Sequence, residues 1–190
     1  MVDDATVARA VAGDADSFRI IVECYEPRIF RFLYGLVRDR ELARDLTQET
    51  FLSAYSAIGR TGTGLKLAAW LYTIARNHAM SELRRRRLVP WVPLHKPRND
   101  DEPMEKLTHQ DGLAADDRAL ARQAMHDLLA KVDAESRTLL LLTAEGFTYR
   151  EIGQMTHLSE AAVRQRVFRA RERLRVLRRD WEDPDGHKRL

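Results

Sequence analysis

The hydrophobic positions in the first ninety residues recur at intervals of three and four, which is the spacing of one buried face of an α-helix. The first run predicts a helix that Pro27 breaks or restarts, because proline fits without loss only in a first turn. Asp39 is placed to cap a second helix, Arg40 to about Ile58, and a third helix runs from about Lys66 to Arg87. The apolar positions of the first two helices are Phe18, Ile21, Val22, Tyr25, Ile29, Phe32, Leu33 and Leu36, then Leu42, Leu46, Phe51, Leu52 and Tyr55.

The third helix has two contrasting faces. An apolar stripe predicts the face that packs on the other helices, and polar or basic residues occupy the opposite face. Trp70 and Tyr72 could stack on unpaired bases, but Trp70 adjoins the stripe, which favours core packing. The stripe consists of Leu67, Leu71, Ile74, Ala75, His78, Ala79 and Leu83, and the opposite face of Thr73, Arg76, Asn77, Met80, Ser81 and Arg84.

Periodicity ends near Leu88. Residues 88–113 contain four prolines and keep no steady period, so they predict an interdomain linker. We therefore expect a first domain at 1–87, a second at 114–180 and a tail at 181–190. Helical spacing resumes in the second domain at Leu120, Ala124, Leu128 and Leu129.

Capping signals in the second domain predict two consecutive helices. Asp133 can cap a helix with four successive leucines, and Gly146 is a natural stop for it. Thr148 and Glu151 have the spacing of a capping box, which starts a short helix. His157 then stands in a turn where glycine is common, and histidine visits the left-handed region more readily than most residues.

The last helix predicts a DNA-reading surface. Ser159 is its cap, and its apolar stripe has spacings of 4, 3, 4 and 3 residues. Arginine can bind guanine, glutamine can bind adenine, and phenylalanine can pack on a thymine methyl. An arginine-rich solvated helix is the alternative, but the cap, turn and stripe arrive in the register of a helix-turn-helix. The stripe is Val163, Val167, Ala170, Leu174 and Leu177, and the side chains off it include Arg164, Gln165, Phe168, Arg169 and Arg171.

Charge is unevenly placed along the 190 residues, although the net charge is only +3 at pH 7. No acidic residue lies between Glu49 and Glu82, and residues 84–98 hold six bases and no acid. Residues 99–117 hold seven acids and one lysine, whereas 164–179 hold eight arginines and one glutamate. Two basic surfaces separated by an acidic tract predict two contacts with a polyanion.

Several classes of protein are disfavoured. Cys24 is the single cysteine, expected to be at least half-buried, and the six histidines lack zinc-ligand spacing. No signal peptide and no apolar run of about 20 residues is visible, so a cytoplasmic protein without direct membrane insertion is expected. An enzyme acting on nucleic acid would need clustered carboxylates or a metal. The acids Asp100, Asp101 and Glu102 lie in the linker without partner ligands, so we expect no enzyme, no metal and no cofactor.

Five strings in order resemble an extracytoplasmic-function (ECF) sigma factor of the sigma-70 family of bacterial RNA polymerase. The resemblance covers both expected domains. It implies an all-α fold of two small helical domains, a sigma region 2-like bundle and a region 4-like helix-turn-helix, joined by a flexible linker. The strings are Asp45–Phe51, Trp70–Asn77, Ser136–Leu140, Gly146–Ile152 and Val163–Arg171.

The resemblance also implies which residues bind which partner. The motif that docks on core polymerase is matched by Asp45, Gln48 and Glu49, which share one helix face. Reading and melting of the promoter −10 element is implied for Arg60, Thr73, Arg76, Asn77, Ser81, Arg84 and Arg85. Reading of the −35 element is implied for Arg164, Gln165, Phe168, Arg169 and Arg171. The Arg60–Leu67 loop is the expected pocket for an unstacked base, and its stretch at 59–65 is more glycine-rich than is usual in the family.

Core RNA polymerase, promoter DNA and a cognate anti-sigma factor are the partners that the resemblance implies. An anti-sigma factor of this kind could hold the protein at the membrane from the cytoplasmic side. The alternative is a stand-alone helix-turn-helix regulator with an unrelated helical first domain. A regulator binds duplex operator alone, usually as a dimer, whereas a sigma factor confers promoter-specific initiation on core polymerase.

Overall fold

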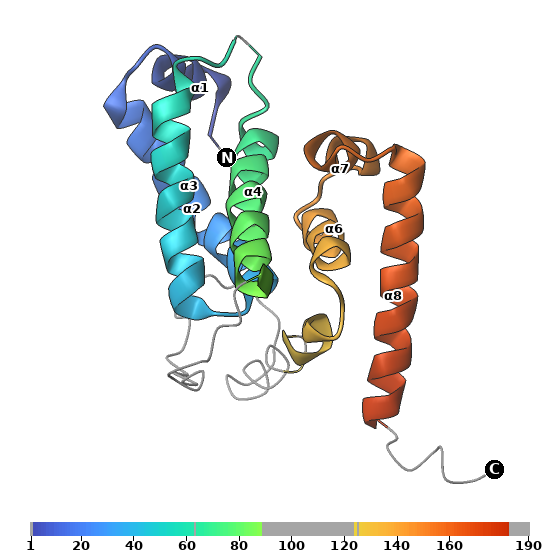
Figure 1. The fold of residues 1–190 in the computed structure, drawn as a ribbon. Coiled ribbons are helices and arrows are strands. Elements are labelled where there is room, and N and C mark those ends of the chain that lie inside the picture. Colours follow the sequence, from blue (N-terminus) through green and yellow to red (C-terminus); the bar gives the residue numbers. More distant parts are fainter. Residues whose placement is uncertain (1, 63, 89–123, 125, 183–190) are drawn as a thin grey trace, which may run out of the picture.

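The computed structural model describes residues 2–62, 64–88, 124 and 126–182, with the side chains of 87, 88 and 179–182 left aside. The regular structure within these residues is α-helical, as the resemblance implied (Figure 1). The predicted linker at 88–113, apart from the end of a helix at Leu88, lies outside the described residues, and so does the acidic tract at 99–117.

Four helices form the first group, and an aspartate caps the N-terminus of each of the first three. They are α1 (Asp4–Val11), α2 (Ala15–Val37), α3 (Arg40–Ile58) and α4 (Leu67–Leu88). Asp3, Asp14 and Asp39 each accept a hydrogen bond from the backbone amide three residues later. Such a cap supplies about 1 kcal/mol by satisfying an amide that the helix leaves unpaired. The cap at Asp39 and the spans of α3 and α4 agree with the prediction to within a residue or two, whereas α1 was not predicted.

Helix α2 continues through Pro27, so the predicted break or restart there is wrong. Proline removes one backbone hydrogen bond and crowds the preceding turn. On either side of it, however, Tyr25 and Ile29 are 6% and 0% exposed, respectively, in one core. Burial of both flanking segments in the same core holds the helix together across the proline.

The second group contains α6 (Ala134–Ala144), α7 (Tyr149–Thr156) and α8 (Glu160–Glu182), and residues 126–130 are helical just before α6. Asp133 accepts from the Ser136 amide at 2.9 Å, which confirms the predicted cap. The capping box is present in both directions, with Glu151 N to Thr148 Oγ1 at 3.3 Å and Thr148 N to Glu151 Oε2 at 3.0 Å. In this half of the chain, α6 and α7 begin where the capping residues predict.

The turn residues of the helix-turn-helix also behave as their sequence predicts. Gly146 has a φ of 94° and His157 a φ of 57°, both in the left-handed region. Ser159 Oγ accepts from the Ala162 amide at 3.2 Å and caps α8. The predicted stripe of α8 is buried at Val163, Val167 and Ala170 and half-buried further along.

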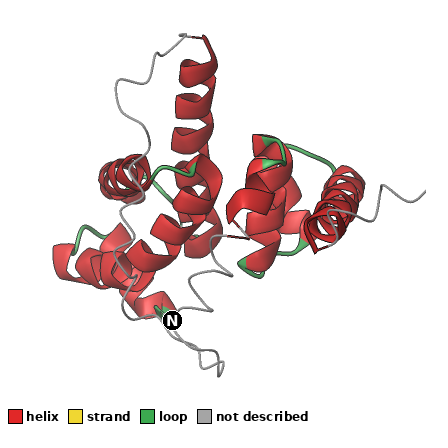
Figure 2. Cartoon of the chain, turned by 90° about the horizontal axis from the view of Figure 1, so that it is seen from below, coloured by secondary structure: helices red, strands yellow, loops and turns green. Residues whose placement is uncertain are grey.

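The two helix groups lie side by side and share one continuous set of buried side chains (Figures 1 and 2). Helix α6 packs on α2 and α7 packs on α4, while α8 packs on α6 and α7 at the outer edge. The sequence predicted two domains but gave no indication of this direct packing.

Candidate polymerase and nucleic-acid interfaces

The residues predicted to bind polymerase share an exposed face of α3. Asp45, Gln48 and Glu49 are all exposed there. Two apolar side chains expected in the core, Leu52 and Tyr55, are 69% and 55% exposed on the same helix, so that expectation is wrong. The α3 face therefore offers apolar area as well as charge.

Threonines take part of the buried face of α3, and this explains the error at Leu52 and Tyr55. Thr47 and Thr50 are 4% and 0% exposed. Their hydroxyls donate to the carbonyls of Ala43 and Leu46 at 2.7 and 2.6 Å, so their burial leaves no polar group unsatisfied. A pattern based on apolar letters alone cannot find such a face.

Glu49 is tied to the neighbouring helix α4. Its Oε2 lies 3.5 Å from Nδ1 of His78, and His78 Nε2 is 3.0 Å from Ser53 Oγ. The His78 side chain is 31% exposed, so it lies at the α3–α4 seam instead of deep in the stripe where it was expected. His78 thereby links the exposed face of α3 to α4.

The face of α4 predicted to read the −10 element is divided into an open and a covered part. Asn77, Ser81 and Arg84 are exposed, whereas Thr73 and Arg76 are half-buried towards α6 and α7. Burial lowers the pKa of Arg76, and the Glu135 carboxylate opposes the shift. The Arg76 Nε is buried without a hydrogen-bond partner, which is costly for a guanidinium donor.

Beyond Ser81, an acidic side chain organises the arginines at the end of α4. Glu82 accepts from Arg85 Nε and Nη2 at 2.7 and 2.8 Å and from Arg86 Nε at 2.9 Å. The hydrogen bonds from Arg85, followed by those from Arg86, lower the pKa of Glu82 to about 2. The predicted phosphate-binding residue Arg85 is thus paired with a carboxylate of its own helix.

Arg60 and the loop after α3 stand at the other end of α4. Arg60 is exposed, and its Nη2 donates to the Ser56 carbonyl at 3.2 Å. In the loop, Gly64 has a φ of 83°, a conformation that few other residues adopt. The structure describes this loop except for residue 63.

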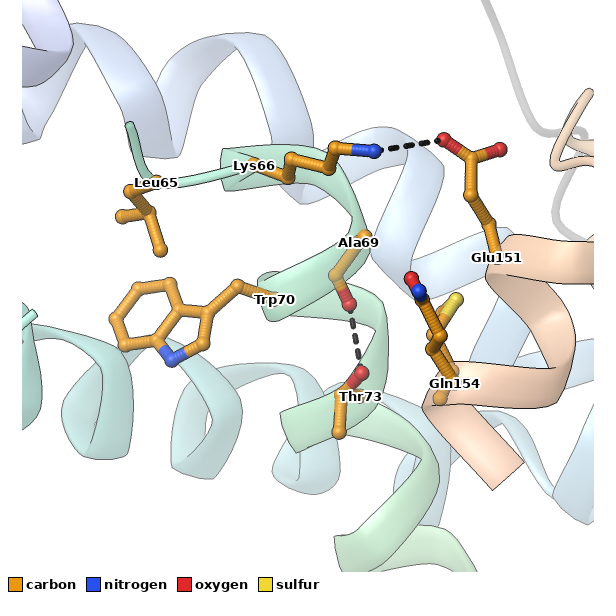
Figure 3. Close-up of a pocket in the computed structure, with 8 residues that line it drawn as sticks. Leu65, Lys66, Ala69, Trp70, Thr73, Glu151 and Gln154 are labelled. Carbon is orange, nitrogen blue, oxygen red and sulfur yellow. Dashed lines mark hydrogen bonds and ion pairs between the residues drawn. The ribbon is translucent and has the colours of Figure 1, made fainter. Parts of the chain in front are cut away.

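A shallow pocket lies where the start of α4 faces α7 (Figure 3). Lys66 Nζ and Glu151 Oε1, 3.6 Å apart, form an ion pair across it. Trp70 forms part of the wall beside Leu65, half-buried against the core, in agreement with its predicted packing role. Tyr72 is fully buried, so it is not available to stack on a base in this conformation.

The residues of α8 predicted to read the −35 element are exposed together. They comprise Arg164, Gln165, Phe168, Arg169 and Arg171, and Phe168 is 64% exposed although it is aromatic. Arg164 is held by Glu160 at 2.9 Å, one turn earlier. Helix α8 lies on the side of the second group away from α4 (Figure 1), so this surface is open.

Comparison with known proteins assigns the two parts of the chain to two regions of one protein family. The sigma-70 region 2 family matches residues 21–89, and the sigma-70, region 4 family matches residues 122–174. RNA polymerase sigma factor CarQ of Myxococcus xanthus is 34% identical over 166 residues, covering 87% of this chain and 91% of CarQ. The chain belongs to the ECF group of the sigma-70 family. ECF RNA polymerase sigma factor SigW of Bacillus subtilis is 26% identical over 172 residues, covering 88% of this chain and 92% of SigW.

Two solved structures share this fold. The sigma factor RpoE, crystallised with the anti-sigma factor NepR from Bartonella quintana, has a TM-score of 0.68 and 27% identity, covering 87% of this chain and 98% of RpoE. CnrH, in complex with the cytosolic domain of CnrY, has a TM-score of 0.69 and 24% identity, covering 98% of this chain and all of CnrH. The similarity to CnrH concerns the fold alone.

Sequence reasoning missed the residues that join region 2 to region 4 of this sigma factor. Arg28, Tyr72, Arg137 and Glu145 make hydrogen bonds between the two regions. Periodicity placed the leucines of α6 but could not foresee what its polar residues contact. Separately, no helix of the described residues is long and apolar enough to cross a membrane, and no three His, Cys, Asp or Glu side chains among them gather as metal ligands.

Proposed function

We propose that this protein directs core RNA polymerase to specific promoters and assists DNA opening at initiation, without catalysing a bond change itself. Membership of the ECF sigma family supports this function. The observation that carries it is the presence, in one chain, of an exposed acidic and apolar α3 face, a polar α4 face and a basic α8 face.

Each surface has a distinct role in this proposal. Asp45, Gln48 and Glu49, with Leu52 and Tyr55 beside them, bind the polymerase. The α4 face with Arg60 reads and melts the −10 element, and α8 reads the −35 element in the major groove. Arginines at the end of α4 hold the phosphate backbone and supply affinity without sequence. The domain limits remain those expected from the sequence, 1–87 and 114–180.

Regulation by a partner protein follows from the same similarity. RpoE, at 27% identity, forms a complex with an anti-sigma factor. We infer that a protein of this type binds the present chain in the bacterial cytoplasm, and that any attachment to the membrane is through that partner. Failure to find a protein that blocks transcription by this chain would contradict the inference.

Run-off transcription with purified core polymerase on a library of promoter fragments tests the main proposal. We expect transcripts from a sequence-defined subset of the library only when the chain is added. Binding to duplex DNA as a symmetric dimer, without any effect on core polymerase, would establish a stand-alone regulator instead.

A further inference from the structure

Glu145 occupies a position that its own helix does not favour. It is the C-cap of α6, where a carboxylate meets the negative end of the helix dipole. Its Oε2 accepts hydrogen bonds from Arg28 Nη2 and Nε at 3.1 and 3.3 Å, and from the Tyr72 hydroxyl. The Glu145 side chain is only 18% exposed. These contacts with region 2, not the local structure of region 4, account for the largely covered carboxylate.

The Glu145 carboxylate helps to raise the pKa values of both of its partners, Tyr72 and Arg28. Burial and the hydrogen bond to Glu145 raise the pKa of Tyr72, so its hydroxyl remains protonated and acts as the donor. Burial alone would lower the pKa of Arg28, but Tyr72 and Glu145 together raise it. The Tyr72 ring meanwhile packs edge-on against Phe32 of region 2 and Phe147 of region 4, with centroids 5.1 and 5.2 Å apart.

Arg137 makes a second contact between the regions. It is 8% exposed, and its Nη1 donates to the carbonyl of Leu36 at 2.7 Å. That carbonyl lies in the last turn of α2, where helical carbonyls have no partner within the helix. A guanidinium from region 4 therefore caps a helix of region 2, and its Nη2 donates to the Val132 carbonyl of its own region at 2.8 Å.

Gly35 makes room for the closest apolar approach. A Cβ atom at this position would lie 3.1 Å from Cδ2 and 3.2 Å from Cδ1 of Leu141. Glycine inside a helix is unfavourable by about 1 kcal/mol relative to alanine, so a packing reason is expected where it stands. Even an alanine at position 35 would therefore require Leu141 to shift by a few tenths of an ångström, and a longer side chain would have to displace it.

The packing of region 4 on region 2 covers part of the α4 surface that the proposed function assigns to the −10 element. Thr73 and Arg76 are half-buried on the side of α6 and α7, and Met80 Sδ lies 3.9 Å from the Thr138 hydroxyl. Because α8 is two helix-packing distances from α4, the two reading helices are only about 20 Å apart. The −10 and −35 elements lie roughly two DNA turns apart, about 70 Å, so both cannot be bound in this arrangement.

We propose that Arg28, Gly35, Tyr72, Arg137, Leu141 and Glu145 form an intramolecular latch that holds region 4 over the −10-reading face of α4. The latch leaves the predicted −35-reading residues of α8 exposed to solvent. Its formation rests on the contacts alone, whereas its effect on promoter binding rests on the proposed function.

A charge swap tests the latch on the full-length chain without DNA. Glu145→Arg and Arg28→Glu each place like charges together, so small-angle scattering should give a larger radius of gyration for each single variant. The double variant restores an opposite pair and should return to the wild-type radius. Controls with the same charge changes are Glu23→Arg and Arg19→Glu, at exposed positions of α2 that pair with each other and, for Arg19, with Asp16 of the same helix.

Gly35→Gln provides an opening variant that does not depend on charge. Glutamine is a better helix former than glycine, so α2 should stay folded while the side chain displaces Leu141. Circular dichroism checks that each variant keeps its helical content. Radii equal to the wild type in both Glu145→Arg and Gly35→Gln would overturn the proposal, and so would failure of the double swap to restore compactness.

DNA binding separates the latch from the proposed function. For a chain closed nine-tenths of the time, opening should tighten binding to a pool of random single-stranded 12-mers up to tenfold. Binding of α8 to duplex promoter DNA should change less than twofold. Equal changes for both DNAs would overturn the covering of α4. If run-off transcription failed while the radii behaved as expected, the proposed function would fall and the latch would stand.

Discussion

Local interactions at single residues account for the parts of the fold that the sequence predicts well. The caps at Asp39, Asp133 and Ser159 and the box at Thr148 depend on neighbours three residues away. Such contacts are visible in sequence because their geometry is local. The polar contacts of Arg28 and Arg137 join residues more than 100 positions apart, and no local rule could pair them.

Glu82 combines a structural and an electrostatic role, and its replacement should affect both. In Glu82→Gln the amide cannot pair with Arg85 and Arg86 as a carboxylate does, so non-specific DNA binding should strengthen about two- to tenfold at low salt and less at high salt. Fluorescence anisotropy on a random duplex measures this. Glu41→Gln, at an exposed position with one weaker pair, is the control and should change little.

The same carboxylate should give a defined dependence of stability on pH. Because the folded pKa of about 2 lies below the ordinary value of 4.5, the ionised group stabilises the fold above about pH 4.5. This contribution decreases as pH falls towards 2. The melting temperature of the wild type should therefore exceed that of Glu82→Gln at neutral pH, and the difference should shrink between pH 4.5 and 2. A difference independent of pH would contradict the assignment.

His157 tests the left-handed turn of the helix-turn-helix. With a φ of 57°, glycine removes the steric strain at this position but adds entropy to the unfolded chain. His157→Gly should therefore leave the free energy of unfolding unchanged within about 1 kcal/mol or raise it. His157→Val, with its branched Cβ, should lower stability clearly. Thermal melts of both variants measure this, and a marked loss in the glycine variant would disprove the prediction.

Among the elements, periodicity located most helices but assigned their faces less reliably. Helix α8 has one apolar stripe, and its buried side follows that stripe. Helix α3 buries Thr47 and Thr50 and exposes Leu52 and Tyr55, so its faces could be assigned only from the structure. Helix α1 is eight residues long, too short for periodicity to show.

Helix α7 and its turn depend on Gly153, which belongs to no sequence motif of the helix-turn-helix described above. A Cβ on Gly153 would lie 2.6 Å from the Leu158 carbonyl oxygen, a backbone atom that cannot move without opening the turn. Gly153→Ala should therefore destabilise region 4 by about 1–3 kcal/mol, as overpacking does. Chemical denaturation measures the change. Gly62→Ala, at a position with no atom within 4 Å of the added Cβ, is the control.

Substitutions in α4 and in α8 should impair promoter recognition in different ways. Asn77→Ala should impair opening and the choice of −10 sequence, while Arg164→Ala should weaken −35 recognition by about 1–3 kcal/mol. Transcription on promoters altered in one element at a time measures both. Identical behaviour of the two variants across these promoters would disprove the division of roles.

At the scale of the whole molecule, the continuous core makes a final prediction about unfolding. Buried side chains of both regions belong to one cluster, which includes Leu139 and Leu142 of α6 with Leu36 and Tyr72 of region 2. Domains that share a core unfold together, so calorimetry on the wild type should give a single transition.

Gly35→Gln should divide that transition into two, because it separates α6 from α2 while leaving the core of each region intact. Both regions lose the apolar cover of the other, but α2 gains a better helix former, so region 2 should give the transition at the higher temperature. Region 4 should melt earlier, having lost the apolar cover of region 2 over α6 and α7. A single transition at the wild-type temperature would mean that the shared core does not couple the two regions.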